Sequence, residues 1–198
     1  MSARTRASSP SGAPLLYQPF LWGLGWDLVD GSLDGASQDS TANRYVASPI
    51  IVPFRCRVDK IGVWAGGQVN SGQFMLGLHD SDVNLLPNAL VCQTAAANVV
   101  GLSSNLLQFR VPTTTPTIQP GLYYVGYICD TTYALGVAGM RVMTVFIAQV
   151  VDAGLLTFDG FGAAYIQNMG GFLMPDPFVE VLSDTHIVSC LALKVTAV

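Results

Sequence analysis

The sequence predicts an all-β protein, an antiparallel β-sandwich of jelly-roll-like form with an extended N-terminal arm. Three observations indicate this class: many short runs alternate apolar and polar residues, turn-forming residues separate these runs, and almost no stretch has a helical period. We expect residues 1–43 to form the arm with its linker, and residues 44–198 to form the sandwich domain.

The arm divides into a polar start and an aromatic stretch. Residues 1–14 (MSARTRASSPSGAP) contain little that could be buried, whereas residues 15–26 (LLYQPFLWGLGW) are apolar without a clean period. Large aromatic side chains are typical anchors of protein interfaces, so this stretch is predicted to dock onto neighbouring subunits. The alternative is that it packs on its own domain and covers a sheet edge. The predicted assembly contacts are Leu15, Tyr17, Phe20, Trp22 and Trp26.

A hairpin is predicted over residues 54–82, where two alternating runs flank a loop rich in Gly and Asn. The alternation changes phase at Asp59-Lys60, which indicates a β-bulge. The side chains expected to face inward are Phe54, Cys56, Val58, Ile61 and Val63 in the first run, and Phe74, Leu76 and Leu78 in the second.

Further strands are predicted at 45–52, 89–94, 106–111, 121–129 and 187–195. Pro49 would confine its strand to a sheet edge or a break, because proline lacks the N–H that a ladder uses. Residues 121–129 are apolar on both faces, so we expect a central strand covered on both sides. Residues 142–151 fit a strand, and a helix over 140–153 is the alternative.

The composition indicates burial against partners. The chain is 51% hydrophobic and only 11% charged, against about 25% charged residues in ordinary soluble domains. A single sandwich cannot hide that much apolar surface, and no apolar run approaches the ~20 residues of a membrane-spanning helix. We therefore expect partner subunits and no membrane insertion. With a net charge of −4 and no basic stripe along the chain, nucleic acid is not an expected partner.

Catalytic, cofactor-binding and metal sites are not predicted. His79 has an adjacent carboxylate, but no nucleophile motif accompanies it, so a locally bonded strand-end histidine is expected. Residues 80–84 predict a solvated turn, with a hard-cation site as the alternative. A paired-carboxylate glycosidase stays open because aspartates are numerous, but nothing selects a pair.

The four cysteines are far apart and form no C-x-x-C pair, which predicts buried free thiols. One disulfide across the sandwich is the alternative. These cysteines are Cys56, Cys92, Cys129 and Cys190.

Sugar binding is a further possibility, because sandwich aromatics can stack on pyranose rings. Core or interface positions are the simpler interpretation of these aromatics. The residues concerned are Trp64, Tyr123, Tyr127 and Tyr165.

Several segments together resemble the β-sandwich of tailed-bacteriophage virion proteins, including tail-fibre and head-decorating proteins. They are residues 58–63 (VDKIGV), 72–82 (GQFMLGLHDSD), 86–91 (LPNALV), 119–125 (QPGLYYV), 172–178 (FLMPDPF) and 187–194 (IVSCLALK). The resemblance spans residues 45–195, with a poor match over 133–168. His79 stands where the family pattern usually has an aromatic residue, and Tyr124 where it often has Trp. These two departures leave a sugar site without support.

The resemblance implies a non-enzymatic structural component of a virion, of the tail-fibre, decoration or collar type. It also implies a homo-oligomer, with a trimer favoured, assembled with other virion structural proteins in the host cytoplasm. The alternative is a receptor- or carbohydrate-binding module at a fibre tip, with a host-surface glycan as ligand. A polysaccharide-degrading enzyme is a third class.

Overall fold

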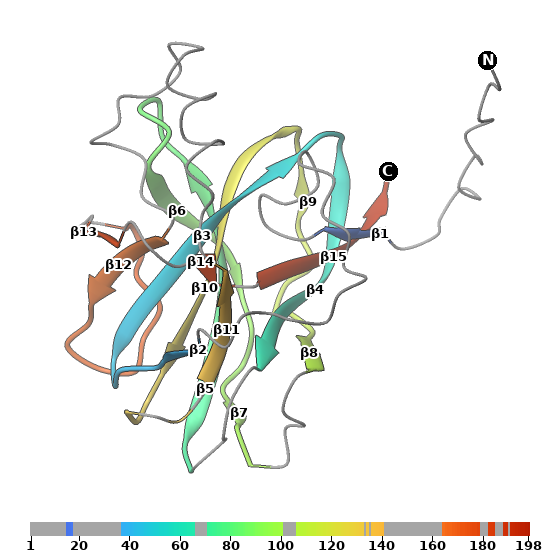
Figure 1. Ribbon diagram of the computed structural model, residues 1–198. Helices are drawn as coiled ribbons and strands as arrows, with labels where there is room; N and C mark the ends of the chain where they lie inside the picture. The colour runs from blue at the N-terminus through green and yellow to red at the C-terminus, as the bar shows by residue number, and fades with distance from the viewer. Residues whose placement is uncertain are drawn as a thin grey trace, which may run out of the picture.

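A computed structural model describes residues 15–17, 37–65, 71–100, 106–132, 134, 136–140, 164–178, 182–184, 188–189 and 191–198. This part of the chain contains strands and no helix, and its strands form two antiparallel sheets packed as a sandwich (Figure 1). The all-β antiparallel sandwich is therefore confirmed. The jelly-roll form of its connections stays a prediction.

The first sheet, here called sheet A, has the strand order β1-β15-β4-β11-β14. Strand β2 lies beside β11, and both β8 and β9 pair with β4. The bounds are β1 Leu15–Tyr17, β2 Ser37–Asp39, β4 Cys56–Ala65, β8 Leu106–Arg110, β9 Thr117–Ile118, β11 Gly136–Met140, β14 Val188–Ser189 and β15 Leu191–Ala197.

The second sheet, here called sheet B, has the order β13-β12-β3-β10-β5-β6, with β7 beside β5. The bounds are β3 Arg44–Val52, β5 Gln73–Ser81, β6 Pro87–Gln93, β7 Ala97–Asn98, β10 Gly121–Cys129, β12 Ala164–Asn168 and β13 Leu182–Asp184.

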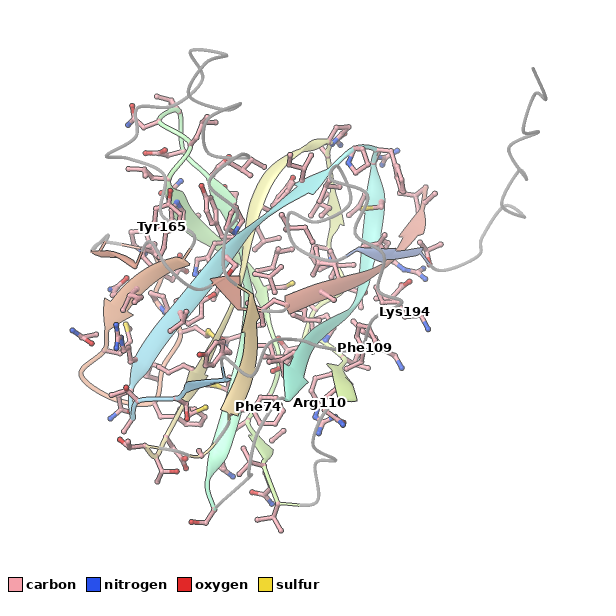
Figure 2. The ribbon with its side chains drawn as sticks, in the orientation of Figure 1. Phe74, Phe109, Arg110, Tyr165 and Lys194 are labelled. Atoms are coloured by element: carbon pink, nitrogen blue, oxygen red, sulfur yellow. The ribbon has the colours of Figure 1, made fainter. Side chains whose placement is uncertain are left out.

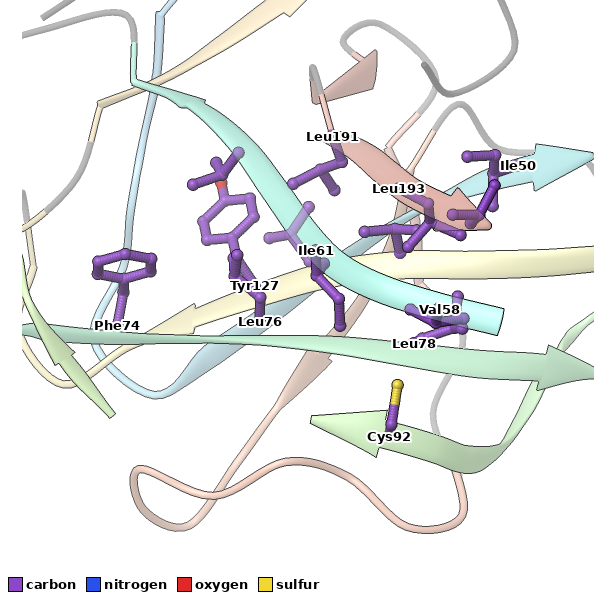
Figure 3. Close-up of a cluster of buried hydrophobic side chains, with 14 of the residues drawn as sticks. Ile50, Val58, Ile61, Phe74, Leu76, Leu78, Cys92, Tyr127, Leu191 and Leu193 are labelled. Carbon is purple, nitrogen blue, oxygen red and sulfur yellow. The ribbon is translucent and has the colours of Figure 1, made fainter. Parts of the chain in front are cut away.

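The main hydrophobic core lies between the two sheets (Figure 3). It forms because alternate residues of every long strand point inward and are apolar. The predicted inward rows of 54–82 are confirmed, with Phe54 partly buried against the cluster and the other seven side chains inside it. Sheet A adds Leu191, Leu193 and Val195, and sheet B adds Val46, Ile50, Val125 and Tyr127.

The predicted hairpin over 54–82 is wrong, because β4 belongs to sheet A and β5 to sheet B. The two strands face each other across the core and pair with different neighbours. The predicted bulge is confirmed: Val195 pairs with Val58 and Lys194 with Lys60, so Asp59 is the extra residue. Two alternating runs with a turn between them carry no information about which sheet each run enters.

Strand β10 is central and covered on both sides, as predicted. It pairs with β3 on one side and with β5 on the other, and its residues from Tyr124 to Cys129 are buried on both faces. Strand β3 is only partly at an edge, because β12 pairs with Arg44–Ala47 and stops before Pro49. The other side of β3 pairs with β10 along nearly its full length.

Two short strands of the expected arm take part in sheet A. Leu15–Tyr17 forms β1 along β15, and Ser37–Asp39 forms β2 along β11. β1 covers the side of β15 that β4 leaves open, which favours the alternative of a covered sheet edge for these three residues. The strand expected at 142–151 lies outside the described part, and so does the alternative helix over 140–153 apart from Met140, which ends β11. None of the residues that the structure places forms a helix capable of crossing a bilayer.

Candidate functional site

His79 lies on the outer face of sheet B, in a second cluster of buried side chains outside the main core. Its side chain is fully buried. The Tyr45 hydroxyl lies 3.0 Å from its Nδ1, and the carbonyl oxygen of Pro175 lies 2.9 Å from its Nε2. The expectation of a locally bonded histidine is wrong, because both partners come from segments distant in sequence.

These contacts define the tautomer of the neutral imidazole. A backbone carbonyl can only accept, so Nε2–H donates to Pro175, and Nδ1 then accepts from the Tyr45 hydroxyl. Burial lowers the pKa of His79, while the Pro175 carbonyl and the carboxylates of Asp176 and Asp80 act in the opposite direction. With both nitrogens bonded and no solvent access, the neutral ring has no atom free for a metal or a substrate.

The Tyr45 side chain reaches His79 by crossing β10 over Gly126. A Cβ atom at Gly126 would lie 2.3 Å from the Tyr45 hydroxyl oxygen and 2.6 Å from the carbonyl oxygen of Val46. Gly77 is the register partner of Gly126 on β5, and a Cβ there would lie 3.0 Å from the Met174 sulfur. Because neither glycine has a side chain, Tyr45 and Met174 can pack directly against the backbone of β10 and β5.

Residues 169–178 (MGGFLMPDPF), here called the belt, cover this outer cluster. The belt follows β12 and begins with a hydrogen bond from the Met169 N–H to the Asn43 carbonyl. The Phe178 ring then packs edge-on against Tyr45 and His79, with centroid distances of 5.7 and 5.9 Å. Apolar and aromatic contacts of this kind bury the ring faces that sheet B would otherwise expose.

The belt also closes the free edge of β6. The Phe178 N–H donates to the Asn88 carbonyl at 3.0 Å, and the Leu90 N–H donates to a carboxylate oxygen of Asp176 at 3.2 Å. An edge strand with unpaired backbone groups is a template for pairing with another chain. The belt therefore protects β6 from such pairing as well as covering the sheet.

Tyr124 and Tyr165 complete the outer cluster beside the belt. Their rings pack edge-on with a centroid distance of 5.1 Å, and the Tyr124 hydroxyl donates to the Leu85 carbonyl. Burial is the main reason why the pKa of Tyr124 is raised far above its ordinary value. Tyr165 and Tyr127, two of the sugar-stacking candidates, are buried and present no ring face to a ligand.

The other two sugar-stacking candidates have different outcomes. Tyr123 is partly buried against the main core, and its hydroxyl donates to the Gln119 carbonyl. The side chain of Trp64 lies outside the described part.

The acidic turn after β5 is held by its own carboxylates. Asp82 accepts from the N–H groups of Asn84 and Leu86, each at 2.8 Å, and Asp80 accepts from the Ala89 N–H at 2.7 Å. The predicted turn is confirmed. No group of His, Cys, Asp and Glu that could hold a metal ion occurs among the placed residues.

Cys56, Cys92 and Cys129 are buried free thiols, as predicted. Burial raises the pKa of Cys92 and of Cys129 to about 12, so both are protonated at neutral pH. Cys190 lies outside the described part.

The predicted assembly contacts are only partly placed. Leu15 and Tyr17 lie in β1, as register partners of Val195 and Leu193. Phe20, Trp22 and Trp26 fall outside the described residues, so their role stays a prediction.

A group of basic side chains on the outer face of sheet A was not predicted from the sequence. Lys60 and Lys194 are register partners on β4 and β15, and Arg57 lies on the same face of β4. Figure 2 shows Lys194 and Phe109 on sheet A, away from Tyr165 on sheet B. These basic residues are far apart in the sequence, so they form no basic stripe along the chain. Strand pairing brings them together, and sequence spacing does not reveal which strands pair. The phase change at Asp59 was the only available signal, since it turns Lys60 to the outer face.

Comparison with family models, curated proteins and solved structures gives no match to this chain.

Proposed function

We propose that the protein is a non-enzymatic structural component of a tailed-bacteriophage virion, of the tail-fibre, decoration or collar type. In this role the sandwich is a rigid body that docks onto neighbouring subunits in a homo-oligomer, with a trimer favoured. The sequence resemblance over residues 45–195 is the source of the virion assignment, and the antiparallel sandwich is compatible with it.

The observation that carries the structural role is the use of the polar groups in the outer cluster. His79, Tyr45 and Asp176 all bond to other parts of the protein, and together they fix the belt to sheet B. In an enzyme, groups of this kind would be aimed at a substrate. Here they stabilise a covered and self-contained body.

Exposed apolar side chains support docking onto neighbours. In a chain with few charges, large side chains such as Val83, Val100 and Leu173 are 95%, 71% and 67% exposed. Obligate assemblies bury such side chains between subunits.

Particle composition tests this proposal. Particles purified by density gradient from infected cells should contain the chain in a fixed ratio to the major capsid protein. A matched comparison then tests the predicted contacts: Trp22→Ala with Trp26→Ala should reduce incorporation, whereas Thr114→Ala, at an exposed polar side chain, should not. A chain that is abundant in the lysate but missing from purified particles would refute the proposal.

The fibre-tip alternative has a separate readout. Saturable binding of the isolated protein to a host glycan or to host cells would favour a receptor-binding module. The burial of Tyr127 and Tyr165 leaves that alternative with fewer ring faces for sugar stacking.

A further inference from the structure

Two lysines face each other across interior strands of sheet A. Leu193 and Val195 are buried in the core on either side of Lys194, so the Lys194 side chain points to the outer face. Ile61 is buried next to Lys60, and Lys60 is the register partner of Lys194, so both ammonium groups emerge on the same face. Like charges directly opposite each other destabilise a sheet.

Edge protection does not explain this pair. Lysines often protect exposed edges, but β15 lies between β1 and β4, and β4 lies between β15 and β8. The only ion pair in the placed part of the chain joins Arg57 and Asp59, at 2.9 Å. Lys60 and Lys194 form no ion pair in that part, although the charge of Lys194 helps to lower the pKa of Asp59, and one carboxylate accompanies three cations.

Sheet B has the opposite charge at the end where β5 meets β6. Asp80 and Asp82 lie in and after β5, and Asp176 lies on the belt beside Leu90. These three carboxylates are here called the acidic end. Arg44 is the only cation in the described strands of sheet B. It lies at the end of β3 near Tyr127 of β10, whereas Asp80 pairs with Tyr123 near the opposite end of β10.

Exposed apolar side chains accompany both charged surfaces. Val83 and Leu173 lie within the acidic turn and the belt, and both are largely exposed. On sheet A, Val111 directly follows β8, and the Val198 N–H donates to the Arg55 carbonyl. The side chains of Val111 and Val198 are 61% and 57% exposed. Each surface thus combines exposed apolar side chains with charges that are mainly of one sign, the two ingredients of a protein contact.

We infer that the basic outer face of sheet A binds the acidic end of sheet B on a second copy of this chain. The opposite charges of the two surfaces indicate a second copy as the partner. Two basic faces, or two acidic ends, would repel each other if they met. Because two different surfaces meet, the contact is heterologous, and repeating it produces a closed ring or an open filament. The biological purpose of this contact rests on the proposed assembly role. The contact itself can be tested with the purified chain alone.

Sedimentation velocity of the purified full-length protein tests the contact. We expect self-association at ~50 mM salt that weakens at ~500 mM, because exposed charges are screened over shorter distances at high ionic strength. Lys194→Glu should weaken association at least about tenfold, since it places like charges in contact. Arg44→Glu makes the same change in net charge at a distant position and should leave association unchanged.

Zero-length cross-linking identifies the surfaces. A carbodiimide applied to mixed ¹⁴N- and ¹⁵N-labelled protein should join Lys60 or Lys194 of one copy to Asp82 or Asp176 of another. A protein that stays monomeric at ~100 µM and low salt would overturn the inference. So would association that Lys194→Glu does not affect, or cross-links between copies that avoid these residues. None of these results alters the particle experiment, so the two failures can be told apart.

Discussion

The Tyr45 hydroxyl lies 3.0 Å from Nδ1 of His79, although the two residues belong to strands separated by β10. The contact is possible only because Gly126 leaves the path between them open. On its other side His79 bonds the belt at Pro175. One chain of hydrogen bonds thus links β3, β5 and the segment that covers sheet B, and this chain can be tested at each step.

Gly126→Ala should destabilise the protein by about 1–3 kcal/mol or more, the usual cost of forcing an extra methyl group into a packed site. The new Cβ would collide with the Tyr45 hydroxyl and the Val46 carbonyl, and the latter is backbone that cannot move aside. Urea unfolding followed by circular dichroism measures the change.

Gly121→Ala is the matched control on the same strand, because a Cβ there meets nothing closer than 3.6 Å. Equal effects of the two substitutions would contradict the proposed crossing of Tyr45 over Gly126.

Acid should weaken the protein through His79. The folded-state pKa of His79 is lowered by burial, so the unfolded chain takes up a proton at a pH where the folded chain does not. The stability that comes from neutral His79 is present above the unfolded value of about 6.5 and is lost as pH falls through the lower folded pKa. Urea unfolding at a series of pH values between ~5 and ~8 should show this loss, with a slope of up to ~1.4 kcal/mol per pH unit.

His79→Gln keeps a polar side chain but removes the titrating group, so this slope should decrease in the variant. His186→Gln is the control for the second histidine of the chain. A slope that remains in His79→Gln and disappears in His186→Gln would show that His186, and not His79, causes the pH dependence.

Phe178→Ala should cost about 3–5 kcal/mol, the range for deleting a buried aromatic side chain. It removes the ring contacts to Tyr45 and His79 and loosens the belt, which also exposes the edge of β6. We therefore expect a lower unfolding midpoint together with faster hydrogen exchange of the Leu90 N–H.

Leu173→Ala alters the same belt at a side chain that is 67% exposed, and it should change stability little. If both variants exchange the Leu90 amide at the wild-type rate, the belt does not protect β6.

Three thiols should resist modification in the native protein. Burial raises the pKa of Cys92 and Cys129 to about 12, and Cys56 is buried as well. At pH ~8 the folded protein should leave these three unmodified by iodoacetamide, while urea-unfolded protein reacts at all of them. Peptide mass mapping assigns each site, and rapid labelling of Cys92 without urea would show that its strand opens readily.

The alternation of side chains was sufficient to predict the longer strands β3, β4, β5, β6, β8, β10 and β15 and the rows that form the main core. The shorter strands β2, β7, β9, β11, β12 and β13 were not predicted. It also located the extra residue at Asp59, because a change of phase is a local property of the chain. The fully buried character of β10 followed from apolar residues on both of its faces.

Alternation does not identify a strand's lateral neighbour. The run ending at Ala65 and the run beginning at Gln73 had the pattern of a hairpin, yet they enter opposite sheets. For the same reason the long-range partners of His79 and the pairing of Lys60 with Lys194 could not be predicted.

The sequence by itself determined the longer strands, which of their side chains turn inward and that Cys56, Cys92 and Cys129 are buried, because these properties follow from the local order of apolar and polar residues. Only the tertiary structure decided that the belt crosses sheet B, that His79 is bonded on both nitrogens and that the basic residues share one face. Those relationships depend on which strands lie side by side, and that arrangement results from packing the two sheets together over the whole chain.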